Sequence, residues 1–307
     1  MPSKETSFKV LEGKNQMKRL LSVMTLAASL MLVLVPRAAI AQTTVVKGIT
    51  FVNPKSAEYA GKIDFAELER KFPLDKNALK SWTANDLAAL NQEQLDQLYA
   101  RLTAGPMPDG PYYGKIVFTK DGGLEGIARQ FVPIDPLING KFAMLRTFGE
   151  FLWKGKHFYK DEGVLRNMIE DGFAQRASIK AIAWGLLGTN PRFDQMVHSK
   201  IAGQSYFEMF PSKLYCGQSL MDSRRESVII DYAYGDTISG YNSDVDFLAT
   251  REGLSVRDEI RMVHPGLYLG RAYLRQVFGL IFTLTSDQAA QAGDTSESCW
   301  TGTQPRP

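Results

Sequence analysis

The sequence predicts an α+β domain in which short N-terminal helices precede a mainly antiparallel β-barrel. Residues 56–104 place apolar side chains at helical spacing, whereas residues 214–285 contain five strand-like segments in succession. Most of these segments are separated by only a few turn-forming residues, which is typical of antiparallel neighbours. An open sheet of this size would expose two edges, and closure into a barrel removes them.

Capping residues place the N-terminal helices. Thr83 is a suitable N-cap for residues 84–90, and Asn91 is one for the helix that follows. An earlier helical segment over residues 65–70 is stopped by Pro73. The apolar stripe of the last helix consists of Leu95, Leu98, Tyr99 and Leu102.

The chain divides into a signal region followed by three predicted parts. These are an N-terminal helical segment (42–110), the barrel (111–290) and a flexible C-terminal tail (291–307). Three further strands are expected before the five already mentioned, over residues 113–118, 153–159 and 164–169. Residues 139–152 predict a helix, and residues 173–188 fit either a helix or a buried strand.

This succession of strands resembles that of the calycin-like barrels, the group that includes the lipocalins. The resemblance implies a lumen that holds either packed side chains or one small ligand. It concerns the fold and implies no particular function.

Residues 17–41 have the three parts of a cleavable secretory signal: a basic pair, an apolar run and a small-x-small cleavage site at residues 39–41. We therefore expect Met17 to be the initiator and Gln42 to begin a mature chain that is periplasmic or secreted. The alternative is a retained membrane anchor. The apolar run of about 16 residues is shorter than the roughly 20 that span a bilayer, which favours cleavage.

Cleavage removes the basic character of the chain, whose formal net charge is +3. Residues 1–41 carry six Lys or Arg and two Glu, so the mature chain holds 30 basic and 31 acidic residues. Binding to nucleic acid needs a clustered positive excess that neutralises phosphates. We therefore expect no nucleic-acid partner.

Two cysteines lie in the mature region, Cys216 and Cys299. In an oxidising compartment two thiols of one chain usually pair, so we expect a disulfide that ties the C-terminal tail to the barrel. The alternative is that both stay unpaired, with Cys216 buried in a strand.

Strand alternation places one carboxylate on an apolar face. One face of the segment 256–264 consists of Val256, Asp258, Ile260, Met262 and His264. If this face points inward, Asp258 is a buried carboxylate that needs a partner, and such groups are functional candidates. We predict an interior polar cluster of Asp258, Arg271 and Asp231 that fixes the polar end of a ligand.

Tyr232, Tyr273 and His264 complete the predicted ligand-binding set. The alternative for the charged residues is a structural ion pair or a surface ladder, because ion-pair networks form without any function at the site.

No cofactor or metal site is predicted. The three histidines are far apart and lack the spacing of metal ligands. Asn242, Asp244 and Asp246 lack the Gly and Glu of a calcium loop and fit a solvated acidic loop. The chain has no phosphate-binding loop in the right context and no complete nucleophile elbow.

These observations predict an exported, soluble protein that binds a small hydrophobic or amphipathic molecule inside the barrel. Two alternatives remain. One is an exported enzyme that uses the interior carboxylates for acid/base chemistry on a lipid-like substrate. The other is a cell-envelope interaction module without a ligand, which would present an exposed apolar patch.

Overall fold

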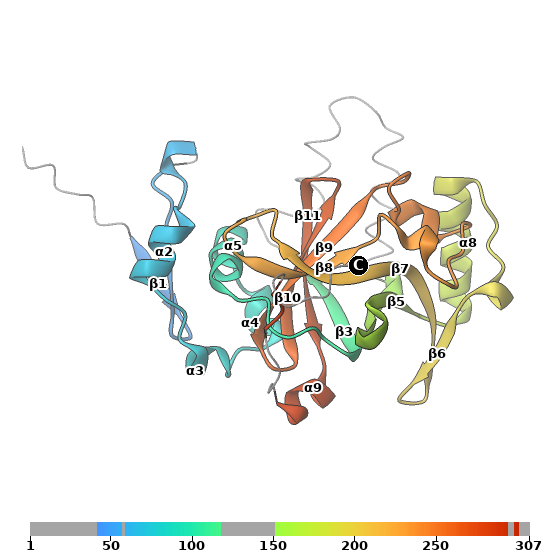
Figure 1. Cartoon of the computed structure of the whole chain (residues 1–307), viewed down its shortest axis with the longest axis horizontal. Helices are drawn as coiled ribbons and strands as arrows, with labels where there is room; N and C mark the ends of the chain where they lie inside the picture. The colour runs from blue at the N-terminus through green and yellow to red at the C-terminus, as the bar shows by residue number, and fades with distance from the viewer. Residues whose placement is uncertain (1–41, 57–58, 118–150, 294–297, 301–307) are drawn as a thin grey trace, which may run out of the picture. The chain divides into compact units, whose positions relative to one another are not determined.

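The computed structural model describes residues 42–56, 59–117, 151–293 and 298–300 (Figure 1). The predicted signal region 1–41, nearly all of the predicted helix 139–152 and most of the predicted tail 291–307 lie outside these residues. Within the described residues, no helix is both long and apolar enough to cross a membrane.

Eight antiparallel strands form a closed barrel, which confirms the predicted antiparallel barrel. They are β3 (Gly110–Val117), β4 (Trp153–Tyr159), β5 (Val164–Glu170), β7 (Gln204–Gln218), β8 (Glu226–Asp231), β9 (Val256–His264), β10 (Leu267–Leu274) and β11 (Val277–Thr285). The order is β5-β4-β3-β11-β10-β9-β8-β7, and β7 pairs again with β5. A further strand, β6 (His198–Ile201), pairs with β7 alone.

Strand β7 closes the barrel because it pairs with both β5 and β8. Its first half pairs with β5, and its second half, from Lys213 onward, pairs with β8. Phe210 lies in the first half with φ of +53°, and the β5–β7 register shifts between Leu165 and Asn167. Irregularities of this kind bend a strand and increase its twist, as closure of a small barrel requires.

The N-terminal segment contains more than the expected helices. Its elements are β1 (Thr43–Val46), β2 (Ile49–Val52), the 3-10 helix η1 (Tyr59–Gly61), and the helices α2 (Phe65–Lys71), α3 (Lys76–Leu79), α4 (Ala84–Ala88) and α5 (Gln92–Arg101). Thr83 and Asn91 are the N-caps of α4 and α5, and each forms a capping box with the residue three positions later. The hairpin β1–β2 was not expected from the sequence.

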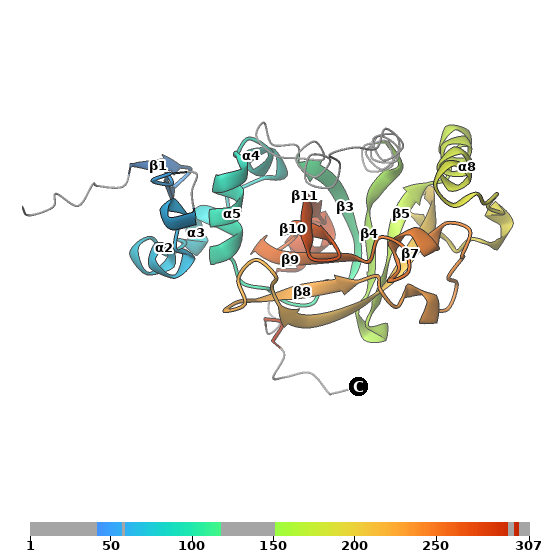
Figure 2. The same cartoon turned by 90° about the horizontal axis from the view of Figure 1, so that it is seen from above.

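These helices cover the outer face of one side of the barrel. Leu95 and Leu98 of α5 share a hydrophobic core with Leu269 of β10 and Ile281 of β11. A second core lies on the inner side of the barrel. Strands β9 to β11 are therefore buried on both faces, and Figure 2 shows α5 and α8 on opposite sides of the barrel.

The remaining elements are η3 (Lys160–Glu162), α8 (Phe173–Leu187), η4 (Phe193–Gln195), η5 (Gly235–Thr237), η6 (Asp246–Ala249) and α9 (Asp287–Ala292). Helix α8 settles the ambiguity over residues 173–188, and it ends at Gly188 in the left-handed conformation that favours glycine. It buries Ile179 and Ala183 but exposes Phe173 and Trp184.

The predicted disulfide between Cys216 and Cys299 is confirmed, with the two Cα atoms 5.5 Å apart. It joins the end of β7 to a residue beyond α9, with a sequence separation of 83. Closing a loop of this length stabilises the fold by about 4 kcal/mol in the chain-entropy description.

Candidate functional site

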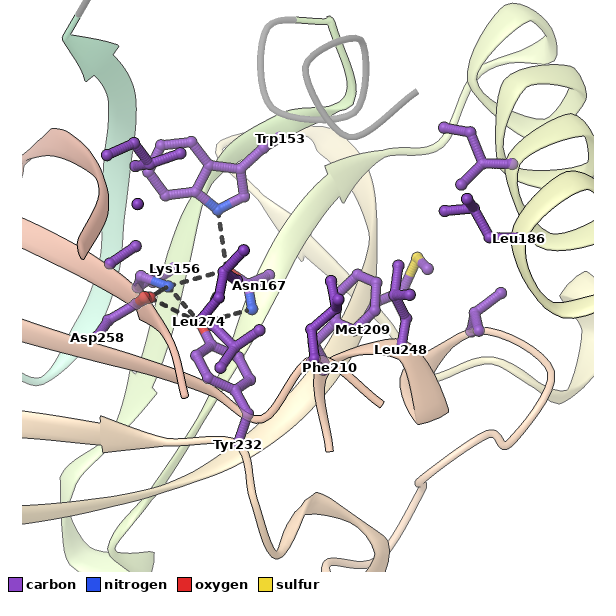
Figure 3. A pocket seen from close by; sticks show the side chains of 18 of the residues that line it. Trp153, Lys156, Asn167, Leu186, Met209, Phe210, Tyr232, Leu248, Asp258 and Leu274 are labelled. Atoms are coloured by element: carbon purple, nitrogen blue, oxygen red, sulfur yellow. Dashed lines mark hydrogen bonds and ion pairs between the residues drawn. The ribbon is translucent and has the colours of Figure 1, made fainter. Parts of the chain in front are cut away.

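A cavity of about 200 Å³ lies inside the barrel. Its wall is mostly apolar and includes Met209 and Phe210 from β7, Leu248 from η6 and Leu186 from α8. Figure 3 shows a group of polar side chains on one side of this wall and α8 on the other. An apolar cavity with a few convergent polar groups is the usual form of a small-molecule site.

The polar group is built around a buried ion pair. The Lys156 ammonium lies 2.8 Å from Oδ2 of Asp258, and their side chains are only 2% and 7% exposed. Lys156 also donates to Tyr232 Oη at 2.5 Å and to Asn167 Oδ1 at 3.0 Å. Its three N–H groups are thus all engaged.

Asn167 and Tyr232 connect the ion pair to the barrel wall. Asn167 accepts from the Trp153 indole N–H at 2.9 Å and donates to Tyr232 Oη at 3.0 Å. The Tyr232 hydroxyl in turn donates to Asp258 at 3.1 Å. The members come from β4, β5, β9 and the residue after β8, so only the closed barrel brings them together.

Three aromatic rings surround the ammonium. The centroids of Trp153, Tyr232 and Phe282 lie 5.6, 5.2 and 5.3 Å from Lys156 Nζ. Cation–π attraction at these distances partly offsets the cost of removing the charge from water. Two glycines make room for the rings: a Cβ at Gly114 would lie 2.2 Å from the Trp153 ring, and one at Gly270 would lie 2.3 Å from the Phe282 ring.

Burial dominates the ionisation behaviour of the cluster. It lowers the pKa of Lys156, and the Asp258 carboxylate opposes this effect. Burial and the adjacent Asp258 charge raise the pKa of Tyr232 well above its usual value, so this side chain is a neutral phenol. The two formal charges are those of the ion pair, which gives the cluster no net charge.

The structure brings only part of the predicted site together. Asp258 and Tyr232 line the cavity, whereas the other four residues lie outside its lining. The predicted interior cluster of Asp258, Arg271 and Asp231 is therefore not formed. Asp258 pairs in register with Ala272, which faces the cavity, so the neighbouring Arg271 points to the opposite face of β10.

Arg271 and Tyr273 belong to the interface with the N-terminal helices. Arg271 donates to Asp96 of α5 and to Tyr273 Oη, and its guanidinium stacks on Phe278 at 4.2 Å. The leucines on this face of β10 are buried under α4 and α5. This face is therefore apolar in sequence, like the face of a strand that points into a lumen.

Asp231 and His264 also have structural partners. Asp231 accepts from the Tyr215 hydroxyl at 3.0 Å on the outer face of β8. The ring nitrogens of His264 lie 2.8 and 2.9 Å from the carbonyl oxygens of Pro265 and Trp82, so His264 joins the end of β9 to the helical segment. Among the described residues, no group of three or more His, Cys, Asp or Glu side chains is suited to hold a metal ion.

Lys156, Asn167 and Trp153 were not among the predicted ligand-binding residues. Trp153 and Lys156 both line the cavity although they are three residues apart. Gly155 explains this, because it has φ of +136° and coincides with a register shift between β4 and β5. The inserted irregularity breaks the alternation of faces on which the prediction depended. The Lys-Gly-Lys stretch at this position is the available sequence signal.

A second carboxylate holds the loop between β8 and β9 against the cavity wall. Asp246 is buried, and it accepts from the backbone N–H groups of Phe210 at 2.7 Å and Asn242 at 2.8 Å. The expected solvated acidic loop is therefore wrong at Asp246. Burial raises the pKa of Asp246 from 3.8 to about 7, against the effect of the two backbone donors.

Comparison with known proteins adds no assignment. No protein-family model and no curated protein matches the chain. One solved structure, of a protein from Thermomonospora curvata, is similar at 13% identity and a TM-score of 0.32 over 64% of this chain and 88% of that chain. A likeness this weak carries no argument about fold or function.

We predict that breaking the ion pair is far more costly than replacing it. Lys156→Met or Asp258→Leu alone should lower the free energy of unfolding by about 3–5 kcal/mol, because each leaves one buried charge unpaired. The double variant should recover most of this loss, since an apolar pair leaves no buried charge without a partner. Urea unfolding of the four proteins measures the coupling, and additive losses in the double variant would contradict the prediction.

Asp246 should make stability depend on pH. Its pKa is about 7 when folded against 3.8 unfolded, so the folded state binds the proton more tightly. This contribution is fully present below pH 3.8 and is lost as the pH rises through about 7. Asp246→Asn cannot titrate, so its unfolding free energy relative to that of wild type should rise across this window, by about 1.4 kcal/mol for each pH unit. Parallel pH curves for the two proteins would refute this origin.

Proposed function

We propose that this protein binds one small amphipathic molecule, with an apolar body and a polar end, inside the barrel. The observation that carries the proposal is the cavity itself: an apolar wall with one buried polar cluster on one side. A barrel of eight strands is wide enough for one small ligand. The calycin-like relationship expected from the sequence belongs to this proposal, and the barrel architecture supports it.

Binding explains the polar cluster better than acid/base catalysis does. Acid/base catalysis uses a proton donor as well as a proton acceptor. Lys156 directs its three N–H groups at neighbouring side chains, and Tyr232 donates to Asp258. Among the described residues, the cluster therefore offers a ligand one acceptor, Oδ1 of Asp258, while its nearest donors are engaged. The arrangement holds a fixed polar surface at one end of an apolar cavity, which serves recognition.

We propose further that the protein acts after export, as a periplasmic or secreted protein. The tripartite pattern of residues 17–41 is the sequence basis. The Cys216–Cys299 disulfide supports it, because such bonds form and persist in oxidising compartments.

Filling the cavity should abolish binding. Ala272 lines the cavity from a barrel strand, so Ala272→Phe places a ring in the ligand's space. We expect the fluorescent probe N-phenyl-1-naphthylamine to bind wild type saturably and the variant at least tenfold more weakly, the loss of several apolar contacts being worth about 1.4 kcal/mol or more. Ala177→Phe on the exposed side of α8 is the matched control and should change affinity less than twofold. If wild type and Ala272→Phe bound the probe equally, the probe would bind outside the cavity and the proposed function would be wrong.

Export should leave a chain that begins at Gln42. Expression of the full chain in a Gram-negative host, followed by intact mass measurement of the periplasmic fraction, should give the mass of residues 42–307 less two hydrogens for the disulfide. Ala41→Pro disturbs the cleavage site and should cause the precursor to accumulate. A chain that stays in the cytoplasm with residues 17–41 intact would overturn the export proposal and leave the binding proposal standing.

A further inference from the structure

We infer that the cavity selects an uncharged ligand whose polar end donates a hydrogen bond to Asp258, such as an alcohol, and discriminates against a carboxylate. This inference rests on the proposed binding function and specifies its ligand class. It follows from which hydrogen-bonding capacities of the polar cluster are used and which remain.

The donors that would hold an anion are already engaged. Lys156 is the only cation among the residues that line the cavity, as far as the structure describes them. Its N–H groups point to Asn167 Oδ1, Tyr232 Oη and Asp258 Oδ2. The Trp153 indole N–H is also committed, to Asn167 Oδ1 at 2.9 Å. A carboxylate that entered would have to displace one of these partners.

An acceptor remains unsatisfied. Oδ1 of Asp258 is buried and has no hydrogen-bond partner among the residues that the structure describes, whereas Oδ2 accepts from both Lys156 and Tyr232. An unsatisfied buried carboxylate oxygen is costly, because the group has lost its water and gained nothing in exchange. Since Asp258 lines the cavity, a hydroxyl or amide N–H on a ligand is the complement that this oxygen lacks.

The electrostatic cost of a charged ligand also favours a neutral one. A carboxylate beside Asp258 would place two like charges together in a medium of low dielectric constant. An ammonium would have to give up its hydration in an apolar cavity whose polar cluster, the Lys156–Asp258 ion pair, has no net charge to offset that cost. An uncharged donor satisfies Oδ1 without either cost.

The position of the cluster also orients the ligand. Lys156, Asn167 and Asp258 lie together on one side of the cavity, and Leu186 of α8 lies on the opposite side (Figure 3). The polar end of the ligand therefore contacts the strands β4 and β9, and its apolar body extends along Phe210 toward α8.

Isomeric probes test this inference. The compounds 1-octanol and 1-methoxyheptane have the same atoms, but only the alcohol donates a hydrogen bond. Displacement of N-phenyl-1-naphthylamine at pH 8, where octanoate is ionised, gives the relative affinities of the three. We expect 1-octanol to bind about tenfold more tightly than either of the others, since one satisfied charged acceptor accounts for a difference of this order.

The double variant Lys156→Met/Asp258→Leu removes both charges of the ion pair, so neither is left buried without its partner. In this variant 1-octanol and 1-methoxyheptane should bind within about twofold of each other, because the unpaired acceptor Oδ1 of Asp258 is gone and Asn167 Oδ1 stays engaged by the Trp153 indole. Leu274→Val, on the apolar wall, is the matched control and should change the affinity for both probes equally.

The outcomes distinguish the inferred selectivity from the proposed binding function. If 1-methoxyheptane or octanoate binds wild type as tightly as 1-octanol, the inferred selectivity is wrong and the binding function stands. A preference for the alcohol that survives in the double variant also overturns the assignment to Asp258. If none of the three probes displaces N-phenyl-1-naphthylamine, the proposed function fails together with the inference.

Discussion

Closure of the sheet through the β5–β7 pairing is the constraint on which the rest of the structure depends. It gives the sheet an inner face that water reaches poorly, and the N-terminal helices then cover part of the outer face as well. Asp258, Glu259 and Arg261 of β9 and Arg271 of β10 are consequently buried, although they point to different sides of the sheet. Asp258 is paired with Lys156 inside, while Arg261, which is fully buried outside, donates to the Tyr99 carbonyl of α5 at 2.8 Å.

Much of the strand pattern could be predicted because local signals define it. The hairpins have recognisable turn residues, and β7 to β11 follow one another in the chain as they do in the sheet. The N-caps at Thr83 and Asn91 are equally local. The hairpin β1–β2 was missed because its first strand, Thr43–Val46, is largely exposed and has no alternation of apolar and polar residues.

The site could be predicted only in part, since alternation separates two faces but does not say what covers each one. It indicated that Asp258 faces the lumen, and Asp258 lines the cavity, whereas on the strand before it Tyr232 lines the cavity and Asp231 does not. It failed for Arg271, whose apolar neighbours pack under helices that come from a distant part of the chain. Lys156 was missed because its partner Asp258 is 102 residues away in sequence. Pairing of this kind is a property of the closed barrel, and the local Lys-Gly-Lys stretch does not identify the partner.

The position of the disulfide sets an order of events during synthesis. Cys216 lies near the end of β7, whereas Cys299 follows β11, the last strand of the barrel. The second thiol therefore emerges only after every strand of the barrel has been made. The disulfide therefore cannot direct the early pairing of strands. It forms last and stabilises a sheet whose strands have already paired by hydrogen bonding.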